Sequence, residues 1–308
     1  MTLIDRAIVK VLPAVPRPVV RKLSQRYIAG SELADACRVV KALNAKGKMA
    51  TLDVLGEEIH NQEEALAAVD AYRDVFDTIR EQRLDSNVSV KLTGLGLKLD
   101  EGLCFENVSA IVRCAEERDN FVRIDMEDSS TTTETLEIYR RLRSEGLDSV
   151  GVVLQAYMKR TLADIAALAD LRPNVRVCKG IYIEPPEIAH QDFDTVRLNF
   201  IEAITALLDV RGYVAVASHD QWVIAEAVRI FAERDLAPEE YEFQMLLGVR
   251  SDLGDELVRE GHRLRIYVPF GRQWYEYSLR RLQENPKIAG YIAADTFKRL
   301  RPGRNSRP

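Results

Sequence analysis

FVRIDMEDSSTTTETLEIYRRLRSEGLDSVGVVLQAY (residues 121–157) contains one full repeat of the pattern that decides the fold. Its two ends, FVRIDME and VGVVLQAY, are apolar runs of strand length, and between them residues 132–146 place apolar side chains at helical period. Gly146 stands where the helical stretch should stop. A strand, a helix and a second strand predict a βαβ unit, whose strands are parallel and whose crossover is right-handed.

The same alternation extends along most of the chain. Helical period recurs at 65–82 and 196–210, and further glycine stops follow Lys46, Arg211 and Glu260. The remaining strand-like runs are MATLDVLG (49–56), VSVKLTGLGL (88–97), VRVCKGIY (175–182), YVAVAS (213–218), YEFQML (241–246) and LRIYVPFG (264–271). Eight strands alternating with helices predict an α/β fold that closes into a (β/α)8 barrel. A doubly wound open sheet is the alternative, but LGEEI after the first run lacks the expected G-x-G-x-x-G turn.

Length and composition narrow the class of protein. With 308 residues, 46% of them hydrophobic and 30% charged, the chain can bury a large core, which excludes disordered and fibrous classes. Two domains of ~150 residues would fit this length, but a single barrel routinely takes ~250. We expect a helical arm over 1–48, a catalytic barrel over 49–290, and a C-terminal helix with a basic tail over 291–308.

Charge, cysteines and histidines restrict the partners. A formal net charge of -5 argues against nucleic acid as the main partner. The C-terminal KRLRPGRNSRP fits either a solvated tail or contact with an anionic membrane surface. No clear signal-peptide core is visible near the N-terminus, and no apolar run is long enough to span a bilayer. Cys37, Cys104, Cys114 and Cys178 are far apart, as reduced thiols of a cytoplasmic protein would be, and the scattered histidines predict no metal site.

Polar side chains follow seven of the eight predicted strands, where a barrel would place its active site. Ionisable groups in apolar strands are costly unless they are paired, so we expect them to meet at one rim. Structural roles stay open for each of them: Lys91 and Asp125 can form an ion pair, Lys179 can cap the barrel, and Gln155 can bridge backbone groups. The full set is Lys91, Asp125, Glu127, Gln155, Tyr157, Arg176, Lys179, Tyr182, Ser218, His219, Asp220, Gln244 and Tyr267.

The segment after the eighth run, RQWYEYSLRRLQEN (272–285), is predicted to be a helix. Tyr277, Arg280 and Arg281 are spaced i, i+3 and i+4 and therefore share one face. Two arginines beside a tyrosine suit the bidentate binding of a carboxylate or a phosphate. The alternative is a surface helix in which an arginine pairs with Glu284.

These stretches together resemble the proline dehydrogenases, in particular the short monofunctional bacterial enzymes. The resemblance covers roughly residues 45–290, in the family's order. It is carried by VSVKLTGLGL, VRIDMED, GVVLQAYMKRT, RPNVRVCKGIYIEP, VASHD, YEFQMLLGVR and RIYVPFGRQWYEYSLRRLQENP.

The resemblance implies a distorted barrel that holds FAD, with the last helix over the barrel mouth. The implied reaction is oxidation of L-proline to Δ1-pyrroline-5-carboxylate, with electrons passed to a membrane quinone. The length leaves the product to a separate pyrroline-5-carboxylate dehydrogenase. The location expected is cytoplasmic, with peripheral contact at the inner face of the membrane.

The resemblance also implies roles for single residues. Asp125, linked to Lys91, and Arg176 are implied as catalytic, and Glu57 as a gate that pairs with the first arginine of the last helix. Contacts with proline are implied for Lys91, Leu246, Tyr267, Tyr277, Arg280 and Arg281. Contacts with the flavin are implied for Met126, Gln155, Arg176, Cys178, Lys179, Gly180, Ile181, Ser218 and His219.

The chain departs from the family pattern near the expected flavin. Ser218 and Asp220 stand where threonine and asparagine are common, and Ile181 stands where alanine is more usual. Related hydroxyproline-oxidising enzymes tend to carry a smaller residue where Tyr277 stands, so the resemblance implies a preference for proline over hydroxyproline. The competing hypotheses are oxidation of hydroxyproline or another cyclic imino acid, a Schiff-base aldolase that uses Lys91 or Lys179, and a barrel that only binds a small carboxylate.

Overall fold

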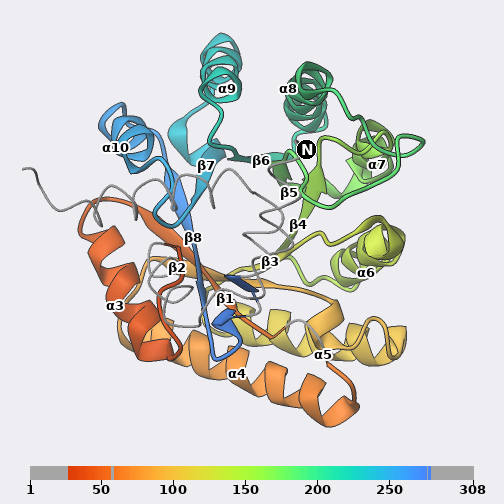
Figure 1. Cartoon of the computed structure of the whole chain (residues 1–308), viewed down its shortest axis with the longest axis vertical. Helices are drawn as coiled ribbons and strands as arrows, with labels where there is room; N and C mark the ends of the chain where they lie inside the picture. The colour runs from red at the N-terminus through yellow and green to blue at the C-terminus, as the bar shows by residue number, and fades with distance from the viewer. Residues whose placement is uncertain (1–26, 57–58, 276, 279–308) are drawn as a thin grey trace, which may run out of the picture.

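A computed structural model describes residues 27–56, 59–275 and 277–278. Eight parallel strands form a closed barrel in chain order, with β8 hydrogen-bonded back to β1 (Figure 1). The barrel prediction is therefore confirmed, and the open doubly wound sheet is excluded. The strands are β1 (Met49–Val54), β2 (Ser86–Val90), β3 (Val122–Ile124), β4 (Val150–Gln155), β5 (Asn174–Cys178), β6 (Tyr213–Ala217), β7 (Tyr241–Leu246) and β8 (Leu264–Phe270).

Helices surround the barrel and cover its outer face (Figure 1). The α-helices are α3 (Leu33–Asn44), α4 (Gln62–Glu81), α5 (Glu101–Glu116), α6 (Thr132–Ser144), α7 (Thr161–Ala167), α8 (Phe193–Asp209), α9 (Gln221–Glu233) and α10 (Ser251–Arg259). Short 3-10 helices are η2 (Thr93–Leu95), η3 (Ser129–Thr131), η4 (Ala169–Leu171) and η5 (Pro238–Glu240). The strands are buried on both faces, which explains why their sequences are nearly continuous in apolar character.

Two helices begin earlier than their apolar period indicates, because side-chain caps add a first turn. Asn61 caps α4 by accepting from the Glu64 backbone N–H at 2.9 Å, so the helix begins at Gln62. Asp192 caps α8 in the same way, accepting from the Thr195 backbone N–H at 2.8 Å. The apolar face becomes visible in sequence only after the polar first turn.

One predicted glycine stop has a different basis. At Arg211-Gly212 the left-handed residue is Arg211, with φ of 57°. A Cβ on Gly212 would lie 2.7 Å from the Pro173 carbonyl oxygen, so the glycine permits a close backbone approach.

The expected N-terminal arm is described only from residue 27 onward, and residues 1–26 lie outside the described part. Helix α3 packs on β8 and β1 and lies in the outer ring between α10 and α4 (Figure 1). In a regular barrel that place belongs to the helix that follows β8. The Ala29 N–H donates to the Pro269 carbonyl at 2.9 Å and joins this segment to β8. The described end of the arm is thus part of the barrel wall.

Three further observations concern the described residues. None of their helices is both long and apolar enough to cross a membrane. All four cysteines are free, and Cys178 is more accessible than Cys37, Cys104 and Cys114, which are buried. In the ranges given above, no group of three His, Cys, Asp or Glu side chains gathers as metal ligands would.

Candidate functional site

A cavity of about 240 Å³ lies at the carboxyl ends of the strands. It brings together most of the residues that the sequence predicts for the site. Among those that line it are Lys91, Asp125, Met126, Gln155, Arg176, Cys178, Lys179, Gly180, Ile181, His219, Leu246 and Tyr267. Ser218 lines an adjoining cavity of about 420 Å³, which shares Lys179, Gly180 and His219 with the first. The shared residues show that the two cavities are neighbours at the same end of the barrel.

Four predicted residues fall elsewhere or cannot be placed. Tyr277 is buried and packs in a cluster with Ile28 and Leu55. Glu57, Arg280 and Arg281 lie outside the described residues, as does most of the predicted helix 272–285. Their implied roles stay predictions.

Asp125, just past the end of β3, is the centre of the polar network. Arg176 Nη2 donates to its Oδ1 at 2.5 Å, and the Tyr267 hydroxyl donates to its Oδ2 at 2.9 Å. Burial raises the pKa of Asp125, but the charges of Arg176 and Lys91 outweigh it and hold the pKa below its ordinary value. The carboxylate is therefore ionised.

Lys91 pairs most closely with a residue that the sequence did not single out. Its Nζ donates to both carboxylate oxygens of Asp53, at 2.9 and 3.0 Å, whereas the Asp125 carboxylate is 3.9 Å away. The link between Lys91 and Asp125 that the resemblance implies is thus the longer of the two. Asp53 is completely buried on β1. The sequence does carry a signal for Asp53, because a carboxylate inside an apolar strand is costly unless it is paired.

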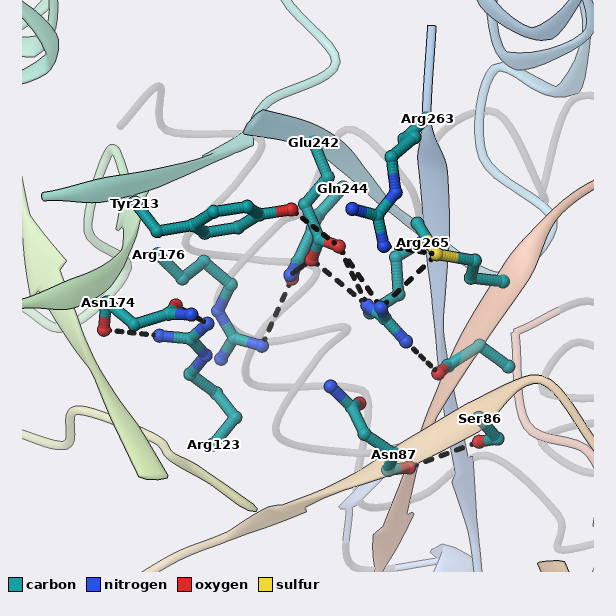
Figure 2. Close-up of polar contacts among 12 residues, drawn as sticks. Ser86, Asn87, Arg123, Asn174, Arg176, Tyr213, Glu242, Gln244, Arg263 and Arg265 are labelled. Atoms are coloured by element: carbon teal, nitrogen blue, oxygen red, sulfur yellow. Dashed lines mark hydrogen bonds and ion pairs between the residues drawn. The ribbon is translucent and has the colours of Figure 1, made fainter. Parts of the chain in front are cut away.

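Arg176 projects from β5 into the barrel and reaches strands on the other side. Its Nη1 contacts Ser89 Oγ on β2 at 3.5 Å. The same nitrogen donates to Gln244 Oε1 on β7 at 3.4 Å (Figure 2). Its guanidinium carbon lies 5.5 Å from the centroid of the Tyr267 ring. Arg176 is thus bound by protein groups on several sides.

His219 is held as a neutral ring with a defined tautomer. Its Nε2 accepts from the Leu246 backbone N–H at 3.0 Å, which leaves the proton on Nδ1. Burial, with a smaller contribution from the charge of Arg250, lowers the pKa of His219 to about 4. A neutral ring of this kind offers one N–H donor to a ligand in the cavity.

Lys179 forms an ion pair with Asp220, which Arg197 also contacts at 2.7 Å. Burial raises the pKa of Asp220, and its hydrogen bonds to Arg197 and Lys179 reverse that shift and lower the pKa. Asp220 also caps α9 by accepting from the Trp222 N–H at 3.1 Å. The aspartate that departs from the family pattern therefore anchors Lys179 at the wall of the site.

Comparison with known proteins assigns this arrangement to a family. The model of the family described as "Proline dehydrogenase" matches residues 36–294. The chain belongs to the proline dehydrogenase family. It is 38% identical over 276 residues to proline dehydrogenase 1 of Bacillus subtilis (strain 168), covering 90% of this chain and 91% of that one. It is 35% identical over 300 residues to a proline dehydrogenase of Deinococcus radiodurans, covering 94% and 97%.

Solved structures agree with the fold of a proline dehydrogenase barrel. Proline utilization A (PutA) of Bdellovibrio bacteriovorus superposes with a TM-score of 0.81 at 22% identity, covering 94% of this chain and 37% of that one. PutA of Corynebacterium freiburgense superposes with a TM-score of 0.76 at 19% identity, covering 94% of this chain and 33% of that one. The chain thus spans about a third of the length of these longer proteins, and the likeness concerns the fold.

The residues of the cavity fit the flavin that the family resemblance implies. Gly180 has φ of 101°, and a Cβ there would lie 2.2 Å from the Tyr157 ring, so only glycine permits this backbone path beside the cavity. Gln155 Nε2 donates to the Glu127 carbonyl at 2.9 Å, which leaves the amide oxygen as an acceptor. Donors come from Arg176, Lys179 and His219. The donors and acceptors match the polar edge of a flavin and its phosphates.

Proposed function

We propose that this protein oxidises L-proline to Δ1-pyrroline-5-carboxylate with bound FAD and passes the electrons to a membrane quinone. The observation that carries the proposal is the cavity at the carboxyl ends of the strands, where Lys91, Asp125 and Arg176 meet in a chain of the proline dehydrogenase family. The site lies where (β/α)8 enzymes place their chemistry.

The flavin would be held along the two adjoining cavities. Arg176, Lys179, Ser218 and His219 supply donors, and Gly180 gives the close backbone approach. When bound, the flavin supplies the hydride acceptor. The positive charge of Arg176 supports negative charge that develops next to it.

Proline would bind on the side of Lys91 and Tyr267. Lys91 and Arg176 carry two positive charges, and Asp53 and Asp125 carry two negative ones, so this network is neutral by itself. A substrate carboxylate therefore needs added cations, and we assign that role to Arg280 and Arg281. Leu246 and the ring of Tyr267 would enclose the proline ring, and Tyr277 would add to them from the last helix.

Substrate orientation also depends on Tyr267. Burial and the charge of Asp125 raise the pKa of Tyr267 well above its ordinary value, so the hydroxyl stays protonated and donates to Asp125. The ring then cannot turn without losing this bond.

Loss of hydride requires a neutral amine, and we therefore expect activity to rise with pH as the substrate is deprotonated.

The test begins with the purified protein. We expect it to be yellow, to bind FAD, and to lose its flavin absorbance when proline is added without oxygen, and the absorbance should return with a soluble quinone. A colourless protein that takes up no FAD would contradict the proposal. Parallel assays with 4-hydroxyproline distinguish the other imino acids, and borohydride trapping on Lys91 or Lys179 would indicate the aldolase alternative.

Contact with the membrane is tested separately. Binding to vesicles with anionic lipids is compared between the full chain and a variant without residues 298–308. We expect the deletion to weaken binding and to leave the reduction of FAD by proline unchanged. Equal binding by both proteins would assign the basic residues to a solvated tail.

A further inference from the structure

The interior of the barrel holds a ladder of polar side chains between its two ends. Glu242 and Gln244 are two residues apart on β7 and therefore point to the same face, into the barrel. Arg265 on β8 pairs in register with Gln244 and also points inward. All three are at least nine-tenths buried. Branched apolar side chains usually fill this space in such barrels.

The end of the ladder nearer the amino ends of the strands is a fixed ion pair between Arg265 and Glu242. Arg265 Nε donates to both Glu242 oxygens, at 2.9 and 3.2 Å, and its Nη1 donates to the Ala50 carbonyl at 2.8 Å. Burial raises the pKa of Glu242, but Arg265 outweighs that effect and keeps the pKa below its ordinary value. The Tyr213 hydroxyl also donates to Glu242, at 3.3 Å. The carboxylate is ionised and cannot move freely.

Gln244 connects this ion pair to the catalytic cavity. Its Nε2 donates to Glu242 Oε1 at 2.5 Å, and its Oε1 accepts from Arg176 Nη1 at 3.4 Å (Figure 2). A carboxylate only accepts and a guanidinium only donates. Only one orientation of the Gln244 amide therefore makes both bonds, and the Glu242 carboxylate sets that orientation.

We propose that Gln244 is a positioning residue, which transmits the fixed place of Glu242 to Arg176 and so holds the Arg176 charge at the cavity wall. Asp125 binds one nitrogen of the guanidinium, and Gln244 binds the other. Without Gln244, Nη1 keeps the 3.5 Å contact with Ser89 Oγ, which is much longer than the bond from Nη2 to Asp125. The inference rests on the proposed function, because the charge that it positions is the one placed beside the flavin.

The first test needs no flavin. Q244M keeps a similar side-chain volume but can neither accept from Arg176 nor donate to Glu242. In its ligand-free crystal structure we expect the guanidinium to have turned away from its wild-type place, whereas unchanged coordinates of Arg176 would overturn the proposal. This outcome is independent of FAD, so a wild-type protein that binds no FAD contradicts the proposed function alone.

The second test measures the flavin potential in the FAD-loaded protein. With the cation displaced, we expect the equilibrium constant for two-electron reduction in Q244M to fall about tenfold, a shift of about 30 mV to more negative potential. The proline KM should stay within about twofold, while kcat falls, because the effect is on charge that develops in the reaction. A lower Tm with an unchanged potential would show a merely structural role and overturn the inference.

Two further variants separate the ladder from general damage to the barrel base. E242D keeps the charge beside Arg265 but shortens the reach to Gln244, so its potential should shift in the same direction, and it should add nothing in the Q244M background. Should Q244M fail to fold, an unchanged Arg176 and potential in E242D would overturn the proposal. Tyr213→Phe is the matched control: it removes the bond to Glu242 on the other side and should lower Tm without changing the potential.

Discussion

Lys91 donates to both carboxylate oxygens of Asp53, and this buried pair joins the end of β2 to the barrel interior at β1. Asp53 is fully buried, and Lys91 is nearly so. Paired charges in such a place keep each other ionised, while a single one would carry the full desolvation cost. The pair therefore provides a lysine whose charge and position are both held beside the proposed substrate site.

Asp53→Asn should both destabilise the protein and weaken proline binding. Loss of one partner of a buried pair typically costs about 3–5 kcal/mol, because the other charge remains without compensation. Urea unfolding measures this loss, and steady-state kinetics should show a raised proline KM. Asp70→Asn is the control, because Asp70 pairs with Arg73 at 2.7 Å and both side chains are at least half exposed. Its free energy of unfolding should fall by about 1 kcal/mol at most.

Gly180→Ala should prevent normal flavin binding. Its Cβ would lie 2.2 Å from the Tyr157 ring, so the backbone beside both cavities must shift. The ratio of flavin to protein absorbance measures the loss. Gly146→Ala is the control. Gly146 also has a left-handed φ, of 80°, but nothing lies near the place of its Cβ, so the substitution should cost only about 1 kcal/mol of stability and keep the flavin. Equal flavin content in both variants would show that flavin binding does not need the backbone path of Gly180.

His219 should make stability fall with acid. Its pKa is about 4 when folded against an ordinary 6.5, so the unfolded chain binds the proton more readily. Stability linked to this group is complete above pH 6.5 and is lost as the pH falls toward 4, by about 3 kcal/mol in all. Urea unfolding at pH 7 and pH 4.5 should show a smaller difference for His219→Gln than for the wild type. Identical pH dependence in the two proteins would contradict the assignment.

Arg281→Met should strongly weaken proline binding and leave the fold intact. A charge-assisted bond to a carboxylate contributes about 2–3 kcal/mol, so the proline KM should rise about 30- to 160-fold. Circular dichroism and Tm should stay close to the wild type, since the role proposed for Arg281 is to bind the substrate and not to pack in the core. Unchanged proline kinetics would show that the carboxylate binds elsewhere.

Much of the architecture is predictable from the sequence because it depends on local periods. Apolar runs such as VGVVLQAY mark strands buried on both faces, and eight of them alternating with helices leave few topologies besides the barrel. The carboxyl ends of parallel strands meet at one rim, so strand order alone predicts that Lys91, Asp125 and Arg176 lie together. The predicted starts of α4 and α8 are too late, because their caps Asn61 and Asp192 precede the apolar period.

Only the tertiary structure decided which partners the polar side chains at the rim bind. Arg176 on β5 reaches across the barrel to Asp125, and Gln244 bridges Arg176 and Glu242, although β5 is not hydrogen-bonded to β3 or β7. Lys91 has two carboxylates near it and lies closer to Asp53 than to Asp125. Sequence by itself determined the strands and predicted Lys91, Asp125 and Arg176 at one rim, because the carboxyl ends of parallel strands meet there. Closure of the sheet decided which of them touch, because the tilt of the strands sets distances across the interior that no local pattern records.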